Sequence, residues 1–238
     1  MPESIVLLHG FGGTHRAWDG VLERLDPGRY LPVALDLPGH GQAPNSGRPI
    51  SFSGCVEDVL ARSPERFSLC GYSMGGRIAL ALAIRAPERV GHLVLVSTTA
   101  GIDDPSERAL RRASDERLAV QLETVPFEDF IESWRTQPLF ADEPSEVGAL
   151  ARADQRCNRP DALAAALRGA GTGQMEPLWG RLGELEMPVM VVVGERDAKF
   201  RALGGRMVAL LANARLIVVP GGHNLPLESP AAIAEVIS

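Results

Sequence analysis

GYSMGG, residues 71–76, places a serine between glycines directly after the apolar run 67–70. Glycine two positions before and two positions after a serine is the spacing of a nucleophile elbow, a tight turn between a strand and a helix that exposes the hydroxyl. The glycines allow the strand and the helix to approach closely. The stretch therefore predicts Ser73 as a reactive side chain, and it places Arg77 one helical turn further on, on the same side of the helix.

Short apolar runs of strand character recur along the chain and alternate with helical patterns. They occupy residues 5–8, 31–35, 67–70, 92–97, 189–193 and 216–219. Strands that alternate with crossover helices form a parallel sheet, so this pattern predicts an α/β fold with helices on the sheet. The first run begins close to residue 1, and we expect no antiparallel strands ahead of it. A chain of 238 residues suffices for one such core.

The alternation of strand and helix patterns stops between residues 99 and 186, where the sequence shows no strand pattern. Helical patterns cover 105–125, 127–134 and 161–167, and prolines separate them. A structureless insertion of this length would be unusual in a compact domain. We therefore expect a helical cap over 99–186, inserted into a core formed by 1–98 and 187–238. Such a cap would lie over the carboxyl ends of the strands, where open α/β sheets bind ligands.

Two later residues can complete a catalytic triad with Ser73. Asp197 follows the run 189–193, and His223 follows the run 216–219. An imidazole can take the serine proton, and a carboxylate can fix the imidazole tautomer and stabilise its cation. Each residue alone could be a loop cap or a turn residue, but their shared position after successive strands favours the triad. Serine, aspartate, histidine is also the chain order of the α/β-hydrolase fold.

Two backbone N–H groups are candidates for an oxyanion hole. One belongs to Met74, directly after the serine, and the other to Phe11 in the glycine-rich stretch 9–13. His9 in that stretch is expected to support the loop. No group of histidines and carboxylates has the spacing of metal ligands, so we expect no metal, and the chemistry considered below needs no cofactor.

Composition and charge narrow the range of partners. The formal net charge of −6 and the pI near 5.4 argue against a nucleic-acid surface. No apolar run approaches the roughly 20 residues of a membrane-spanning helix. Three cysteines without metal spacing, and a start without a basic and apolar leader, predict a cytoplasmic location. The end at Ser238 fits a trimmed C-terminus, and protein partners stay open.

Longer segments resemble one family of α/β-hydrolases. They are 71–77, 107–112 with Ser114-Asp115, 134–140, 171–175 with Leu178-Trp179, and 194–200. They are similar to those of the 2-succinyl-6-hydroxy-2,4-cyclohexadiene-1-carboxylate synthases of menaquinone biosynthesis. This resemblance implies a cofactor-free lyase that eliminates pyruvate from a small-molecule tricarboxylate, 2-succinyl-5-enolpyruvyl-6-hydroxy-3-cyclohexene-1-carboxylate. Ser73, deprotonated by His223, would be the base.

The resemblance also implies residues that bind the substrate. Guanidinium groups bind planar carboxylates in bidentate fashion. The residues implied are Tyr72, a hydrogen-bond donor, Trp134, an aromatic wall, and the arginines Arg77, Arg111 and Arg156, with Arg152 or Arg159 as alternatives to the last. Without the resemblance, Arg111 would be interpreted as a solvated ion-pair residue of a charged helix, and Trp134 as part of the cap core.

Two other functions remain open on these residues. A serine hydrolase, such as a carboxylesterase, a thioesterase or a carbon–carbon bond hydrolase, would use Ser73 as a covalent nucleophile. A non-catalytic ligand receptor of the same fold would act through movement of the cap. Arg77 separates the lyase from the hydrolase, because a generic ester hydrolase has no evident need for a positive charge beside its serine.

Overall fold

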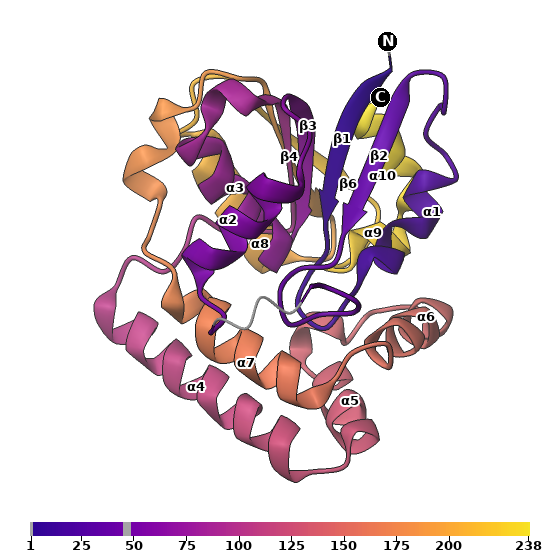
Figure 1. Cartoon of the computed structure of the whole chain (residues 1–238), viewed down its shortest axis with the longest axis vertical. Coiled ribbons are helices and arrows are strands. Elements are labelled where there is room, and N and C mark those ends of the chain that lie inside the picture. The colour runs from indigo at the N-terminus through magenta and orange to yellow at the C-terminus, as the bar shows by residue number, and fades with distance from the viewer. Residues whose placement is uncertain (1, 45–48) are drawn as a thin grey trace.

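The centre of the structure, a computed structural model that describes residues 2–44 and 49–238, is a six-stranded sheet. Its order is β2-β1-β3-β4-β5-β6, and every neighbouring pair is parallel (Figure 1). Each predicted apolar run falls on a strand, and only Ser97 lies beyond its strand. The strands are β1 (Glu3–Leu8), β2 (Tyr30–Leu35), β3 (Phe67–Tyr72), β4 (Val90–Val96), β5 (Val189–Gly194) and β6 (Ala214–Val219).

Two hydrophobic cores lie on opposite faces of the sheet, because successive side chains of a strand point to opposite faces. In β1, Val6 and Leu8 belong to one core, whereas Ile5 and Leu7 belong to the other. Full burial of such a side chain contributes about 1.5–3 kcal/mol, so both faces of this strand stabilise the fold. The first core is covered by α2 (Phe52–Arg62), α3 (Met74–Arg85) and α8 (Ala198–Val208), and the second by α1 (Asp19–Leu22) and α10 (Pro230–Ile237).

Between β4 and β5 the chain forms helices and no strand, and all of this segment lies within the described residues. In Figure 1, α4 to α7 form a layer beyond the carboxyl ends of the strands. We interpret this layer as the cap predicted over 99–186. It consists of α4 (Pro105–Thr124), α5 (Phe127–Arg135), α6 (Ser145–Gln155) and α7 (Pro160–Ala170), with the 3-10 helices η3 (Pro138–Phe140), η4 (Thr172–Gln174) and η5 (Trp179–Glu184).

Local sequence explains where the longest helix begins. The side chain of Asp104 accepts hydrogen bonds from the N–H groups of Ser106 and Glu107, both at 2.8 Å, and Pro105 occupies the first helical position. α4 then packs against α7 through an apolar cluster that includes Ala119, Leu122, Leu163, Ala164 and Leu167. The remaining short elements are η1 (His15–Trp18), η2 (Pro87–Arg89) and α9 (Leu225–Glu228).

The parallel arrangement positions the candidate site. β3, β5 and β6 all end at the same edge of the sheet, and Ser73, Asp197 and His223 follow directly after these ends. Open α/β sheets bind ligands at this edge. Among the helices of the described ranges, none has the length and apolar character needed to cross a membrane.

Candidate active site

Ser73 lies in a backbone conformation that only a tight turn with glycine neighbours can hold, with φ 50° and ψ −107°. A Cβ atom at Gly71 would overlap the carbonyl oxygen of Gly75, and one at Gly75 would overlap the carbonyl oxygen of Leu8. Backbone strain of this kind costs about 1–3 kcal/mol and requires support from the surroundings. Here the Ser73 N–H donates to the Val96 carbonyl at 2.9 Å, and the Thr98 hydroxyl donates to the Ser73 carbonyl at 2.7 Å.

The structure brings the three predicted triad side chains within hydrogen-bond distance of one another. His223 Nε2 lies 3.2 Å from Ser73 Oγ, and His223 Nδ1 lies 2.7 Å from Asp197 Oδ2. The second oxygen of Asp197 accepts the N–H of Phe200 at 3.1 Å, which orients the carboxylate. Asp197 and His223 are both buried. A proton on Nδ1, assigned from this geometry, leaves Nε2 free to accept the serine proton.

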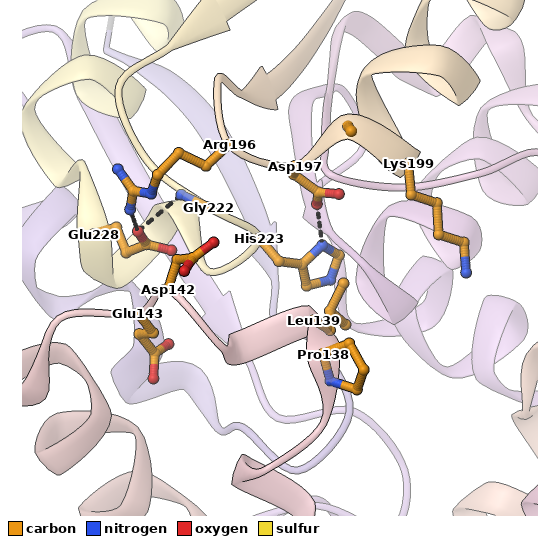
Figure 2. A pocket seen from close by; sticks show the side chains of 11 residues that line it. Pro138, Leu139, Asp142, Glu143, Arg196, Asp197, Lys199, Gly222, His223 and Glu228 are labelled. Atoms are coloured by element: carbon orange, nitrogen blue, oxygen red, sulfur yellow. Dashed lines mark hydrogen bonds and ion pairs between the residues drawn. The ribbon is translucent and has the colours of Figure 1, made fainter.

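A cavity of about 390 Å³ adjoins the serine, and its lining includes Ser73, Met74, Phe11 and His223. Within residues 2–44 and 49–238, the backbone N–H groups of Phe11 and Met74 have no hydrogen-bond acceptor. Two N–H donors without an acceptor beside a serine are able to stabilise a developing oxyanion. A second cavity of about 240 Å³ (Figure 2) adjoins this one, and Pro138, Leu139, Lys199 and His223 line both.

Arg77 lines the larger cavity as a buried cation, with its side chain 5% exposed. Its Nη1 donates to the Ala170 carbonyl at 3.1 Å and approaches Met175 Sδ at 3.8 Å. No carboxylate of the described residues lies within ion-pair distance. Burial lowers the pKa of the guanidinium to about 10, because desolvation penalises the charged form. An anion bound beside Arg77 would compensate this cost.

Two more cations line the same cavity. Arg111 donates from Nε to Asp115 Oδ1 at 2.8 Å, so it forms an ion pair and still borders the cavity. The second is Lys199, which sequence reasoning did not select as a ligand, and which has no ion-pair partner in the described part of the chain. In the sequence, Lys199 could have been recognised as a candidate ligand by its position two residues after Asp197.

Arg156 does not line the larger cavity, and the substrate-binding role implied for it stays a prediction. Its side chain is 47% exposed and forms a bidentate ion pair with Glu128. The alternatives are no closer: Arg152 pairs with Glu132, and Arg159 pairs with Asp161, again at exposed positions. Arg152 lies in the last turn of α6, Arg156 is its C-cap residue and Arg159 is the N-cap residue of α7, and none of the three lines the larger cavity.

Trp134 and Tyr72 differ in which cavities they line. Trp134 lines the larger cavity, and its ring centroid lies 5.0 Å from that of Phe11. Tyr72 does not line the larger cavity. It borders a smaller one of about 40 Å³, which Trp134 also lines, and its ring centroid lies 5.4 Å from that of His223. Tyr72 ends β3 and belongs to the core on the opposite face from Met74, so strand alternation turns it away from the larger cavity.

No group of three or more potential metal ligands occurs in the portion of the chain that is described.

Comparisons with known proteins identify the family of this chain. The family model described as alpha/beta hydrolase family matches residues 5–236. The 2-succinyl-6-hydroxy-2,4-cyclohexadiene-1-carboxylate synthase of Enterobacter sp. (strain 638) is 32% identical over 98% of this chain and 90% of its own length. A Bacillus subtilis (strain 168) protein that bears the same name provisionally is 34% identical over 99% and 89%. The structure of MenH from S. aureus superposes with a TM-score of 0.90 at 31% identity and covers 99% of this chain and 91% of its own. The chain is therefore an enzyme of the alpha/beta hydrolase family and belongs, within it, with these synthases.

Proposed function

We propose that this protein is a lyase that eliminates pyruvate from 2-succinyl-5-enolpyruvyl-6-hydroxy-3-cyclohexene-1-carboxylate to give 2-succinyl-6-hydroxy-2,4-cyclohexadiene-1-carboxylate, a reaction of menaquinone biosynthesis. The relatives that carry the name of this synthase support the proposal. The single observation of this structure that carries it is Arg77, a buried guanidinium without a carboxylate partner in the described residues, beside the reactive serine. A tricarboxylate substrate supplies the missing anion.

In the proposed reaction Ser73 acts as a base and forms no bond to the substrate. His223 takes the hydroxyl proton, and Ser73 Oγ removes the ring proton next to the succinyl ketone. The electron pair of that C–H bond forms an enolate, whose oxygen the N–H groups of Phe11 and Met74 stabilise. The electrons then move through the ring double bond and break the C–O bond to the enolpyruvyl group. This group leaves as the enolate of pyruvate and takes up a proton.

Three cations account for the three carboxylates of the substrate. Arg77 lies deepest, Arg111 lies on the cap wall, and Lys199 lies where the two cavities meet. Binding energy from these remote groups positions the ring proton against Ser73 without taking part in the chemistry. Lys199 takes the place that the family resemblance implied for Arg156.

A serine hydrolase is the second candidate function. The same triad and the same pair of N–H groups would serve acyl transfer, with Ser73 as a nucleophile. The alpha/beta hydrolase fold fits this chemistry equally well. A neutral ester, however, has no use for an unpaired guanidinium buried beside the serine, and this favours the lyase. A ligand receptor without activity is the third candidate, and nothing in the site favours it.

The deciding experiment compares two activities of Arg77 variants. Arg77→Ala is expected to weaken elimination, measured as pyruvate release, by about 2–5 kcal/mol, the range for removing one partner of a buried charge pair. Hydrolysis of a small neutral ester should change little. Arg77→Lys keeps the charge but loses the planar fork, so it should also be impaired. Arg85→Ala is the matched control, because Arg85 lies on the same helix and pairs with Glu57 at the surface.

Equal losses of both activities, or no loss in either, would remove the carboxylate-binding role of Arg77 and the main reason to prefer the lyase. We further propose a cytoplasmic location, in keeping with three cysteines that are all free thiols.

A further inference from the structure

The loop that carries His223 donates two backbone hydrogen bonds to the carboxylate of Glu228 in α9. Glu228 Oε2 accepts the backbone N–H of Gly222 at 2.8 Å, and Oε1 accepts the backbone N–H of Asn224 at 3.1 Å. These two residues immediately precede and follow His223. The carboxylate therefore holds the backbone on both sides of the histidine, and it leaves the imidazole itself free to contact Ser73 and Asp197.

Glu228 also connects this loop to the loop that carries Asp197. Its side chain is 3% exposed, and Arg196 Nη2 lies 2.5 Å from Oε2. Arg196 directly precedes Asp197, and its backbone N–H donates to the Gly221 carbonyl at 3.0 Å. In Figure 2, dashed lines join Glu228 to Gly222 and to Arg196, with His223 beside them. The buried carboxylate of Glu228 thus connects the loop that carries His223 with the loop that carries Asp197.

The surroundings explain why the loop needs such a group. Gly221, at φ 141°, and Gly222 precede His223, and glycine leaves the backbone more conformational freedom than any other residue. Asn224 is held on its other side by the cap, because its Nδ2 donates to Glu143 Oε1 at 3.0 Å. A buried carboxylate is costly unless hydrogen bonds and a cation compensate it. The two N–H donors and Arg196 supply that compensation for Glu228.

We propose that Glu228 is a positioning residue that sets the orientation of the His223 ring between Ser73 and Asp197. The proposal rests on the triad role of His223 in the proposed function, and it holds for either a lyase or a hydrolase. A glutamine at this position retains the shape and one acceptor oxygen, but its NH₂ group would face a backbone N–H donor. The loop would then lose one of its two attachments.

The test is Glu228→Gln, measured in three assays: pyruvate release, neutral-ester hydrolysis, and the rate at which a serine-directed phosphonate labels Ser73. We expect kcat and the labelling rate to fall about 10- to 100-fold, because a misplacement near 1 Å can cost about 10²-fold in rate. KM should stay within about threefold of wild type, because Glu228 does not line the larger cavity, where Arg77, Arg111 and Lys199 would bind the substrate. Glu195→Gln is the control, since Glu195 lies 3.9 Å from Arg196 but contacts neither Gly222 nor Asn224.

A folded Glu228→Gln protein with the kcat, labelling rate and pH profile of wild type would overturn the proposal. If that variant does not fold, Arg196→Gln replaces it, because the side chain of Arg196 is 37% exposed and its removal leaves the core intact. This variant should slow labelling about 3- to 10-fold at unchanged KM, and wild-type labelling would refute the role. Failure of the proposed function has a different signature: wild-type protein that the phosphonate does not label would remove the triad itself.

Discussion

Ser73 combines a strained backbone with a hydroxyl group that lies within hydrogen-bond distance of the His223 imidazole. We expect Ser73→Ala, Asp197→Asn and His223→Ala each to lower the rate of pyruvate release by several orders of magnitude, because the three side chains act as one unit. Each variant should still fold, although His223→Ala removes a buried ring and is expected to lower the unfolding temperature. Near-normal turnover of His223→Ala, measured beside its unfolding curve, would contradict the triad.

The residues differ in how far the sequence could predict their positions. Ser73, Asp197 and His223 follow parallel strands that end at one edge of the sheet, so strand prediction alone brings them together. Their catalytic roles remain predictions. The position of Arg156 depends on how α6 rotates about its axis, which its exposed pair with Glu128 reveals only in three dimensions. The position of the Tyr72 side chain depends on which face of the sheet the last residue of β3 points to.

At the scale of elements, α8 carries a cation where a helix disfavours one. Lys199 lies in the first turn of α8, near the positive end of the helix dipole, and no carboxylate of the described residues pairs with it. A cation in this position at the edge of the cavity suits an anionic ligand.

We therefore expect Lys199→Gln to raise the KM for the tricarboxylate about two- to fivefold, the effect of an exposed ion pair worth up to about 1 kcal/mol. Hydrolysis of a neutral ester should be unchanged, and Lys199→Arg should retain most of the affinity. Arg201→Gln is the matched control, because Arg201 lies in the same helix and donates to the Glu195 carbonyl at the surface. An equal rise in KM for Arg201→Gln would show a general effect of surface charge.

The elements themselves were largely predictable. Apolar runs located all six strands, and the patterns at 105–125, 127–134 and 161–167 correspond to α4, α5 and α7. The patterns named in the sequence did not include α6, which begins with Ser145 directly after Pro144. The order of strands in the sheet arises from crossover packing between distant segments, which no local pattern encodes.

At the scale of the whole molecule, the cavity is assembled from segments far apart in the chain: Phe11, Ser73, Arg111, Lys199 and His223 come from five different elements or loops. Two buried histidines, His9 and His40, lie in the loops that follow β1 and β2 and connect these loops. The Leu37 N–H donates to His9 Nε2 at 3.0 Å, and His40 Nδ1 donates to the Pro38 carbonyl at 3.2 Å. The two ring centroids lie 5.0 Å apart.

Burial lowers the pKa of both histidines, and that of His40 falls to about 3, because desolvation penalises the imidazolium. His40 is therefore neutral in the folded protein near pH 5, whereas an unfolded histidine titrates near pH 6.5. Below pH 6.5 the unfolded state therefore binds protons that the folded state does not, and stability must fall as the pH falls towards 3.

We expect the free energy of unfolding, measured with urea, to decrease between pH 7 and pH 5, with His40 contributing about 2 kcal/mol of that decrease at about 1.36 kcal/mol per pH unit. Carboxylates such as Asp36, whose pKa is lowered by hydrogen bonds from Gln42 and His15, lose their contribution only at lower pH, so they do not obscure this window. His40→Gln removes the titrating group and should flatten the dependence, even if it lowers stability at pH 7. His92→Gln is the control, because His92 is 51% exposed on its side chain and lies on β4 far from these loops in sequence. A dependence in His40→Gln as steep as that of wild type would show that the buried histidines do not link protonation to folding.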